Sequence, residues 1–70
     1  MFPQIEARRA AAGILQKDLC ERAAVHETTY TARKSGRRAL SETTLKKLET
    51  ALEELIKERQ EQLLKIGGAA

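Results

Sequence analysis

The side chains best placed to do chemistry in this sequence are basic ones gathered in one short stretch. Four cations stand close together, at Arg33, Lys34, Arg37 and Arg38. Side chains at this density attract a polyanion, because each one that meets a phosphate releases counterions. The first 40 residues carry eight basic and four acidic side chains, whereas the last 30 carry five and six. The net charge of +3 is modest, so an ordinary solvated basic surface is the alternative interpretation.

Catalysis and metal binding find little support in the residue types. The chain has one histidine, His26, and one cysteine, Cys20. We find no zinc-ligand spacing, no phosphate-binding glycine loop and no Ser-His-acid set beyond chance. A single cysteine cannot form an internal disulfide, and we expect a protein of a reducing cytoplasm. We expect Cys20 to be a small buried residue; a redox sensor is the less favoured alternative. We therefore expect no enzyme, no cofactor and no small-molecule ligand.

Length and composition favour one small helical domain over residues 1–70. A domain of this size buries only about 60% of its unfolded surface, so its core is marginal. The aromatic residues are Phe2 and Tyr30 alone, and the core must therefore use aliphatic residues, which suit helices. No apolar run approaches the ~18 residues of a membrane span, so we expect no membrane partner.

The patterning predicts three short helices, over Pro3 to Ala12, Gln16 to Ala23 and Glu27 to Ser35. Gly13 and Gly36 follow the first and the third, as is typical after a helix. Tyr30 is the main apolar anchor of the third helix. Three threonines give that helix poor intrinsic propensity, so it needs tertiary support.

A long fourth helix is predicted over residues 42–66, with Ser41 as its N-cap. Its leucines recur at 3-4-3 spacing and form an apolar stripe for the core, at Leu45, Leu48, Leu52 and Leu55. A second apolar surface opens beyond the reach of the short helices, at Ile56, Leu63, Leu64 and Ile66.

The spacing within residues 16–35 matches a helix-turn-helix, whose two helices cross at about 90–120°. Counted from Gln16, the packing positions hold Leu19, Cys20, Ala23, Val25 and Tyr30. The stretch from Gln16 to Gly36 resembles the Xre/Cro helix-turn-helix family of phage repressors and related regulators. The resemblance runs from about Ile5 to Leu55, and further pieces that carry it are Gly13 to Leu19, Ser35 to Arg38 and the leucine helix. It implies a lambda-repressor-like bundle of about four helices.

Four residues depart from the family pattern. Leu15 replaces the usual Thr or Ser N-cap, and Ala24 replaces the turn glycine. Arg33 stands where an apolar residue usually packs. Lys34 replaces an acid that in many members pairs with an arginine of the first helix, here Arg8 or Arg9.

The resemblance implies contacts to double-stranded DNA. Gln16 would reach a phosphate or brace a base-contacting residue. The third helix would read base edges with His26, Glu27, Thr28 and Thr31, although His26 could instead cap the helix. Thr can donate or accept and can touch a thymine methyl, and Glu can accept from cytosine N4. The expected phosphate anchors are Arg33, Lys34, Ser35, Arg37 and Arg38, with Arg37 or Arg38 also a candidate for a base contact.

The expected function is a transcriptional repressor, in the simplest case of its own promoter, of the kind that phages and other mobile elements carry. We predict a homodimer on an inverted repeat, joined through Leu52, Leu55, Ile56, Leu63, Leu64 and Ile66, with half-sites about 34 Å apart. One alternative is an antitoxin or adaptor that binds a toxin or another protein through the fourth helix. Another is a nucleoid-type binder without sequence preference.

Overall fold

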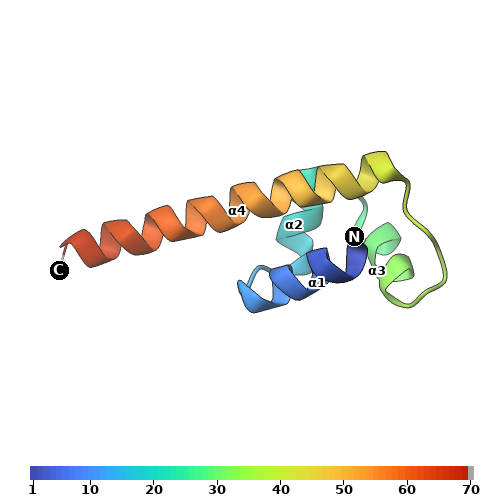
Figure 1. Cartoon of the computed structure of the whole chain (residues 1–70), viewed down its shortest axis with the longest axis horizontal. Helices are drawn as coiled ribbons and strands as arrows, with labels where there is room; N and C mark the ends of the chain where they lie inside the picture. The colour runs from blue at the N-terminus through green and yellow to red at the C-terminus, as the bar shows by residue number, and fades with distance from the viewer. Residues whose placement is uncertain (70) are drawn as a thin grey trace.

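Segments rich in helix-favouring residues are separated by glycines and short loops, and the part of the chain that the structure describes forms four α-helices. The computed structural model describes the backbone of residues 1–69 and the side chains of residues 1–64. The helices are α1 (Phe2–Ala11), α2 (Gln16–Ala23), α3 (Glu27–Lys34) and α4 (Glu42–Ala69). The short helices gather along the first half of α4, and its second half projects beyond them (Figure 1). The predicted all-α bundle with a long last helix is confirmed.

The three short helices end in the same way, with one residue in the left-handed conformation. These residues are Gly13, Ala24 and Gly36, with φ of 70°, 58° and 78°. After α3, for example, Gly36 N–H donates to Arg33 O at 3.0 Å and Arg37 N–H donates to Ala32 O at 2.9 Å. This pair of bonds satisfies carbonyls that the helix leaves open, and it needs a positive φ. Ala24 adopts that conformation with a side chain, at a steric cost.

The predicted helix bounds hold to within a few residues. α1 begins one residue before Pro3, which lies in its first turn, and α2 has the predicted bounds. α3 ends one residue before Ser35, whose hydroxyl donates to the Thr31 carbonyl at 3.1 Å. Ser41 caps α4 as predicted, because its Oγ accepts from the Thr44 N–H at 3.2 Å. α4 continues to Ala69 rather than ending at Ile66.

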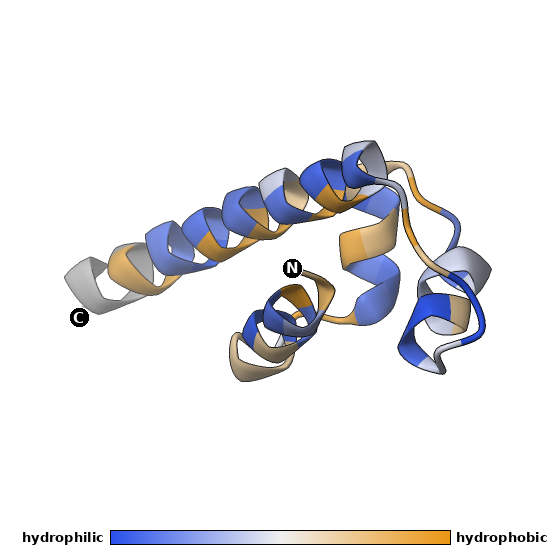
Figure 2. Cartoon of the chain, turned by 45° about the vertical axis from the view of Figure 1, so that its right-hand side comes forward, coloured by the Kyte–Doolittle hydropathy of each residue, from blue (hydrophilic) through white to orange (hydrophobic). Residues whose placement is uncertain are grey.

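The core lies where α1, α2 and α3 meet the first half of α4. Apolar residues along α4 face the short helices (Figure 2). Leu48 and Leu52 are fully buried, while Leu45 and Leu55 flank them as partly buried residues. The other buried residues are Phe2, Ile5, Ile14, Leu19, Cys20, Ala23, Tyr30 and Ala51. The predicted leucine stripe is therefore the spine of the core.

Leu52 cannot serve as a dimer contact, which corrects the prediction made from the sequence. Its side chain is 0% exposed in the single chain, so it has no surface left for a partner. A leucine stripe has the same spacing whether it faces its own core or another chain, and only the packing of α1 and α2 decides between them.

Beyond the core, α4 makes polar contacts with the short helices and then carries exposed leucines. Arg59 Nη1 donates to Gly13 O at 3.1 Å, and Arg22 Nη2 donates to Glu58 Oε1 at 2.9 Å. Leu63 and Leu64 are 64% and 75% exposed. The side chain of Ile66 lies outside the described residues.

We expect Ala24→Gly to stabilise the protein. Glycine removes the left-handed strain but adds backbone entropy to the unfolded chain, which leaves a net gain of about 0.5–1 kcal/mol. Urea unfolding followed by circular dichroism measures it. Ala7→Gly, on the exposed face of α1, is the control and should lose about 1 kcal/mol. An A24G protein no more stable than the parent would show that the turn is unstrained.

Candidate nucleic-acid interface

The unit formed by α2 and α3 is held together by small and apolar side chains at their crossing. Cys20 is 2% exposed there, and the partly buried Val25 packs against the same core. Burial raises the pKa of the Cys20 thiol to about 11, and the nearby Glu27 carboxylate adds to the rise. A thiol with so high a pKa stays protonated and unreactive at neutral pH. Cys20 therefore fills the crossing, as its position in the spacing predicts.

α3 is anchored by one fully buried side chain, that of Tyr30. The Tyr30 ring meets the Phe2 ring edge-on, with centroids 5.0 Å apart. The Arg33 guanidinium covers the Phe2 ring, 4.7 Å from its centroid. Such a cation–π contact stabilises by about 0.5–1 kcal/mol. Arg33 therefore occupies the family's apolar position as a packing residue, with its charge stacked on an aromatic face.

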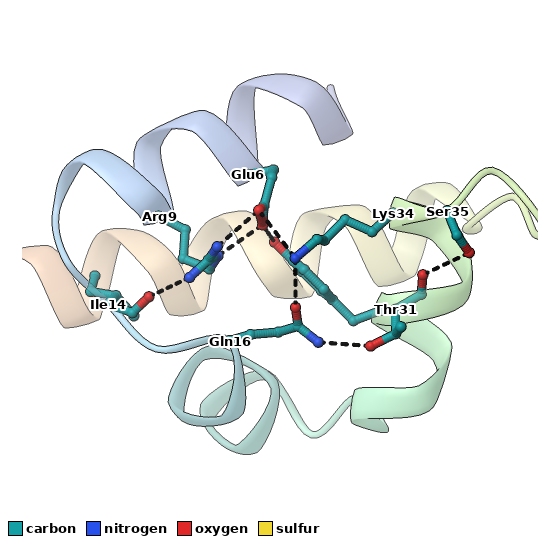
Figure 3. A network of polar contacts seen from close by, with 8 residues as sticks. Glu6, Arg9, Ile14, Gln16, Thr31, Lys34 and Ser35 are labelled. Atoms are coloured by element: carbon teal, nitrogen blue, oxygen red, sulfur yellow. Dashed lines mark hydrogen bonds and ion pairs between the residues drawn. The ribbon is translucent and has the colours of Figure 1, made fainter.

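The hydroxyl of that anchor binds a carboxylate of α1. This carboxylate, that of Glu6, faces Arg9 and Lys34 (Figure 3). Tyr30 Oη donates to Glu6 Oε1 at 2.8 Å. Arg9 donates to both Glu6 oxygens at 2.8 Å, from Nε and Nη2. Its third donor, Nη1, binds the carbonyl of Ile14 at 2.7 Å. Glu6 and Arg9 thus connect α1, the loop that leads to α2, and α3.

The same carboxylate explains the departure at Lys34. Lys34 Nζ lies 3.9 Å from Glu6 Oε2. In the family pattern the acid is on the third helix and the cation on the first; here the two signs are exchanged. Arg9, a predicted partner for an acid at that position, instead binds Glu6 of its own helix. The electrostatic link between α1 and α3 is therefore kept with reversed polarity.

Charges and burial around Glu6 shift two ionisations. The hydrogen bond from Arg9 holds the pKa of the Glu6 carboxyl below its usual range, against the desolvation that burial imposes. Burial raises the pKa of Tyr30 above its usual range, and its hydrogen bond to Glu6 adds to the rise. At neutral pH the pair is therefore a charged acceptor and a neutral donor, which is the stronger kind of hydrogen bond.

Gln16, at the start of α2, bridges to the exposed side of α3. Its Nε2 donates to Thr31 Oγ1 at 2.8 Å, and its Oε1 accepts from Lys34 Nζ at 3.2 Å (Figure 3). Of the two roles that the resemblance implied for Gln16, the geometry displays the brace on a candidate base-contacting residue. A phosphate contact by Gln16 stays a prediction.

The remaining predicted site residues lie at the start of α3, along α3 and in the loop that follows it. His26 is the N-cap residue of α3, as its position predicts, but its side chain makes no capping hydrogen bond. Gln16 and Arg33 are half-buried. The exposed residues of the set are His26, Glu27, Thr28, Thr31, Lys34, Ser35, Arg37 and Arg38.

Sequence reasoning missed Glu6 and Phe2 as residues that position this surface. Glu6 and Arg9 stand three apart in a helix, a spacing that allows a salt bridge. That spacing, together with the lysine at position 34, was the available signal for an acid on the first helix. Phe2 had no comparable signal beyond being one of two aromatic residues.

A family model described as helix-turn-helix matches residues 5–57, from α1 to the end of the buried part of α4. The chain belongs to the Xre/Cro-like helix-turn-helix family. Comparisons with curated proteins and with solved structures gave no match. This helix-turn-helix protein is thus a DNA-binding protein of a family of transcriptional regulators rather than of enzymes.

Within the described part of the chain, no three His, Cys, Asp or Glu side chains lie together as a metal site would need. None of the helices there is long and apolar enough to cross a membrane.

Glu6→Gln should destabilise the protein by about 1–2 kcal/mol at pH 7, because the amide loses the charge-assisted bonds from Arg9. Since the pKa of Glu6 is lowered by folding, its contribution is present above its unfolded pKa and is lost as pH falls through the folded value. The difference between parent and variant, measured by urea unfolding, should therefore shrink from pH 7 to pH 3.

Glu58→Gln is the matched control, since Glu58 pairs with Arg22 at the surface. It should change stability little, because solvent screens that pair. A difference between parent and E6Q that stayed constant with pH would contradict the electrostatic role of Glu6.

Proposed function

We propose that this protein is a sequence-specific transcriptional regulator that places α3 in the major groove of DNA. The observation that carries the proposal is the division of α3 into two sides. Tyr30 is 0% exposed and joins α3 to the core, while Glu27, Thr28 and Thr31 keep their exposure. Their donors, acceptors and methyls match what base edges offer in that groove.

Basic groups next to this side supply the phosphate contacts in the proposal. Arg37 and Arg38 are exposed in the loop after α3, and Lys34 and Ser35 precede them. Such contacts position the protein on the duplex without reading sequence. The guanidinium of Arg33 packs on Phe2, so a phosphate contact is its secondary role in the proposal. The acids Glu53, Glu54 and Glu58 would face away from the DNA.

We further propose that a second copy of the chain packs on the projecting half of α4. Leu15 and Leu63, each 64% exposed, line one hollow of about 580 Å³ between the loop before α2 and α4. The same half of α4 also carries Leu64, which is 75% exposed, and the partly buried Ile56. In a two-fold contact, the same patch of each chain faces its copy. Leucines of one chain could then pack into the hollow of the other, and the reverse. It would also supplement a marginal core.

A two-fold dimer would present two α3 helices to an inverted repeat with half-sites about 34 Å apart. Binding there would repress by occupying a promoter, and the protein's own promoter is the simplest case. The second candidate function, an antitoxin or adaptor, draws on the same exposed Leu63 and Leu64. A nucleoid-type binder would use the basic loop alone.

Arg38→Ala should weaken DNA binding about equally for all sequences and lower the salt dependence by about one phosphate. Thr28→Ala should instead change which sequences bind. The measurement is a gel shift with the DNA upstream of the coding region and with unrelated duplexes, over a salt series. Steep salt dependence with no sequence preference would support the nucleoid-type binder. Absence of DNA binding would support the adaptor.

A double substitution, Leu63→Glu with Leu64→Glu, should make the protein monomeric, because it buries charges in the proposed contact. Sedimentation equilibrium at micromolar concentration, with and without DNA, checks this. Thr43→Glu adds charge to the same helix at an exposed position in its first turn, away from the projecting half, and is the control. A parent protein that stays monomeric even on DNA would remove the dimer.

A further inference from the structure

The outer side of α3 and the loop after it enclose a small hollow. It measures about 240 Å³ and is lined by Glu27, Thr28, Thr31 and Arg37. All four residues are exposed, whereas the anchor of α3, Tyr30, is 0% exposed. These residues span an acceptor-only carboxylate, two hydroxyls and a donor-only guanidinium. The hollow can therefore both donate hydrogen bonds to a ligand and accept them from it.

The hydrogen-bonding direction at Thr31 follows from its neighbours. Lys34 can only donate, so the Gln16 atom that faces it must be the carbonyl Oε1. The Gln16 Nε2 therefore faces Thr31 and donates to its Oγ1. A hydroxyl has one hydrogen, and that of Thr31 is not needed for this contact. Thr31 can thus present a donor to a ligand in the hollow.

Arg37 is also oriented by its surroundings. Its Nε donates to Ser35 Oγ at 3.1 Å, and Ser35 in turn donates to the Thr31 carbonyl at 3.1 Å. These bonds hold the Arg37 side chain beside the last turn of α3. Within the part of the chain whose side chains are described, no hydrogen bond occupies its two Nη groups. Both are available as a pair of donors.

Glu27 supplies the opposite polarity. No hydrogen bond or salt bridge engages its carboxylate among the side chains of residues 1–64, and it forms no ion pair with Arg37 across the hollow. The hollow thus has an acceptor at Glu27 and a pair of donors at Arg37. A ligand that offers one donor and two adjacent acceptors would be complementary to it.

We infer that the hollow reads a single G·C base pair, with the cytosine on Glu27 and the guanine on Arg37. Cytosine N4 would donate to the carboxylate, and guanine O6 and N7 would accept from the guanidinium, with Thr31 a further donor. Among the bases, guanine alone offers two adjacent acceptors in the major groove. This inference rests on the proposed function, and it names one base pair that the DNA site must contain.

The test is selection of binding sites from randomised duplexes, carried out with the parent protein, Glu27→Gln and Arg37→Ala. For the parent we expect a G·C pair in each half-site whose exchange for A·T weakens binding about tenfold or more. Arg37→Ala should lose the guanine preference, and Glu27→Gln should relax the cytosine preference. Both variants must act at the same base pair. Arg38→Ala, in the same loop but outside the hollow, is the control and should leave the selected sequence unchanged.

Three outcomes would overturn the inference alone, and a fourth would overturn it together with the proposed function. One is a selected site with A·T at every preferred position, because the two threonines would then contact thymine methyls. The others are variants that act at two different base pairs, or variants that leave the preference of the parent intact; in these cases the proposed function stands. A parent protein with no sequence preference at all would remove the proposed function together with this inference.

Discussion

The hydrogen bond from the Tyr30 hydroxyl to Glu6 is the interaction on which the DNA-facing surface depends. Tyr30 is the one fully buried side chain of α3, and its hydroxyl, if buried without a partner, would cost about 1–3 kcal/mol. Glu6 provides the partner, and Arg9 keeps Glu6 charged while it also binds the loop before α2. A helix of low intrinsic propensity is thereby fixed to α1 as well as to α2.

The same carboxylate connects the buried side of α3 with the exposed one. Lys34 lies between Glu6 and Gln16, and Gln16 donates to Thr31. At the C-terminal end of α3, Ser35 orients Arg37. Side chains ordered before binding lose less conformational entropy when they meet a ligand, so this arrangement favours a specific contact over a loose electrostatic one. The acid lies on α1 and the cation on α3, the reverse of the family pattern, and this ion pair still links the two helices.

Much of the fold could be predicted from the sequence, because helix periodicity and helix ends are local. The bounds of α2, the cap at Ser41 and the burial of Cys20 and Tyr30 followed from spacing alone. The role of Glu6 did not, since a charge pair between two segments depends on how their helices cross. The assignment of Leu52 failed for a related reason, because one stripe of leucines can face either its own core or another chain. What the exposed residues of α3 contact is a property of the complex, and spacing supplies only candidates.

The most direct test of the central claim is a nuclear magnetic resonance titration of the isotope-labelled protein with its selected duplex. We expect the largest changes in amide shifts at Gln16, in residues 27–31 and at Arg37 and Arg38. Residues 53–64 should change little apart from effects of association between chains. Largest changes along the projecting half of α4, with α3 unaffected, would contradict the claim that α3 is the DNA-reading helix.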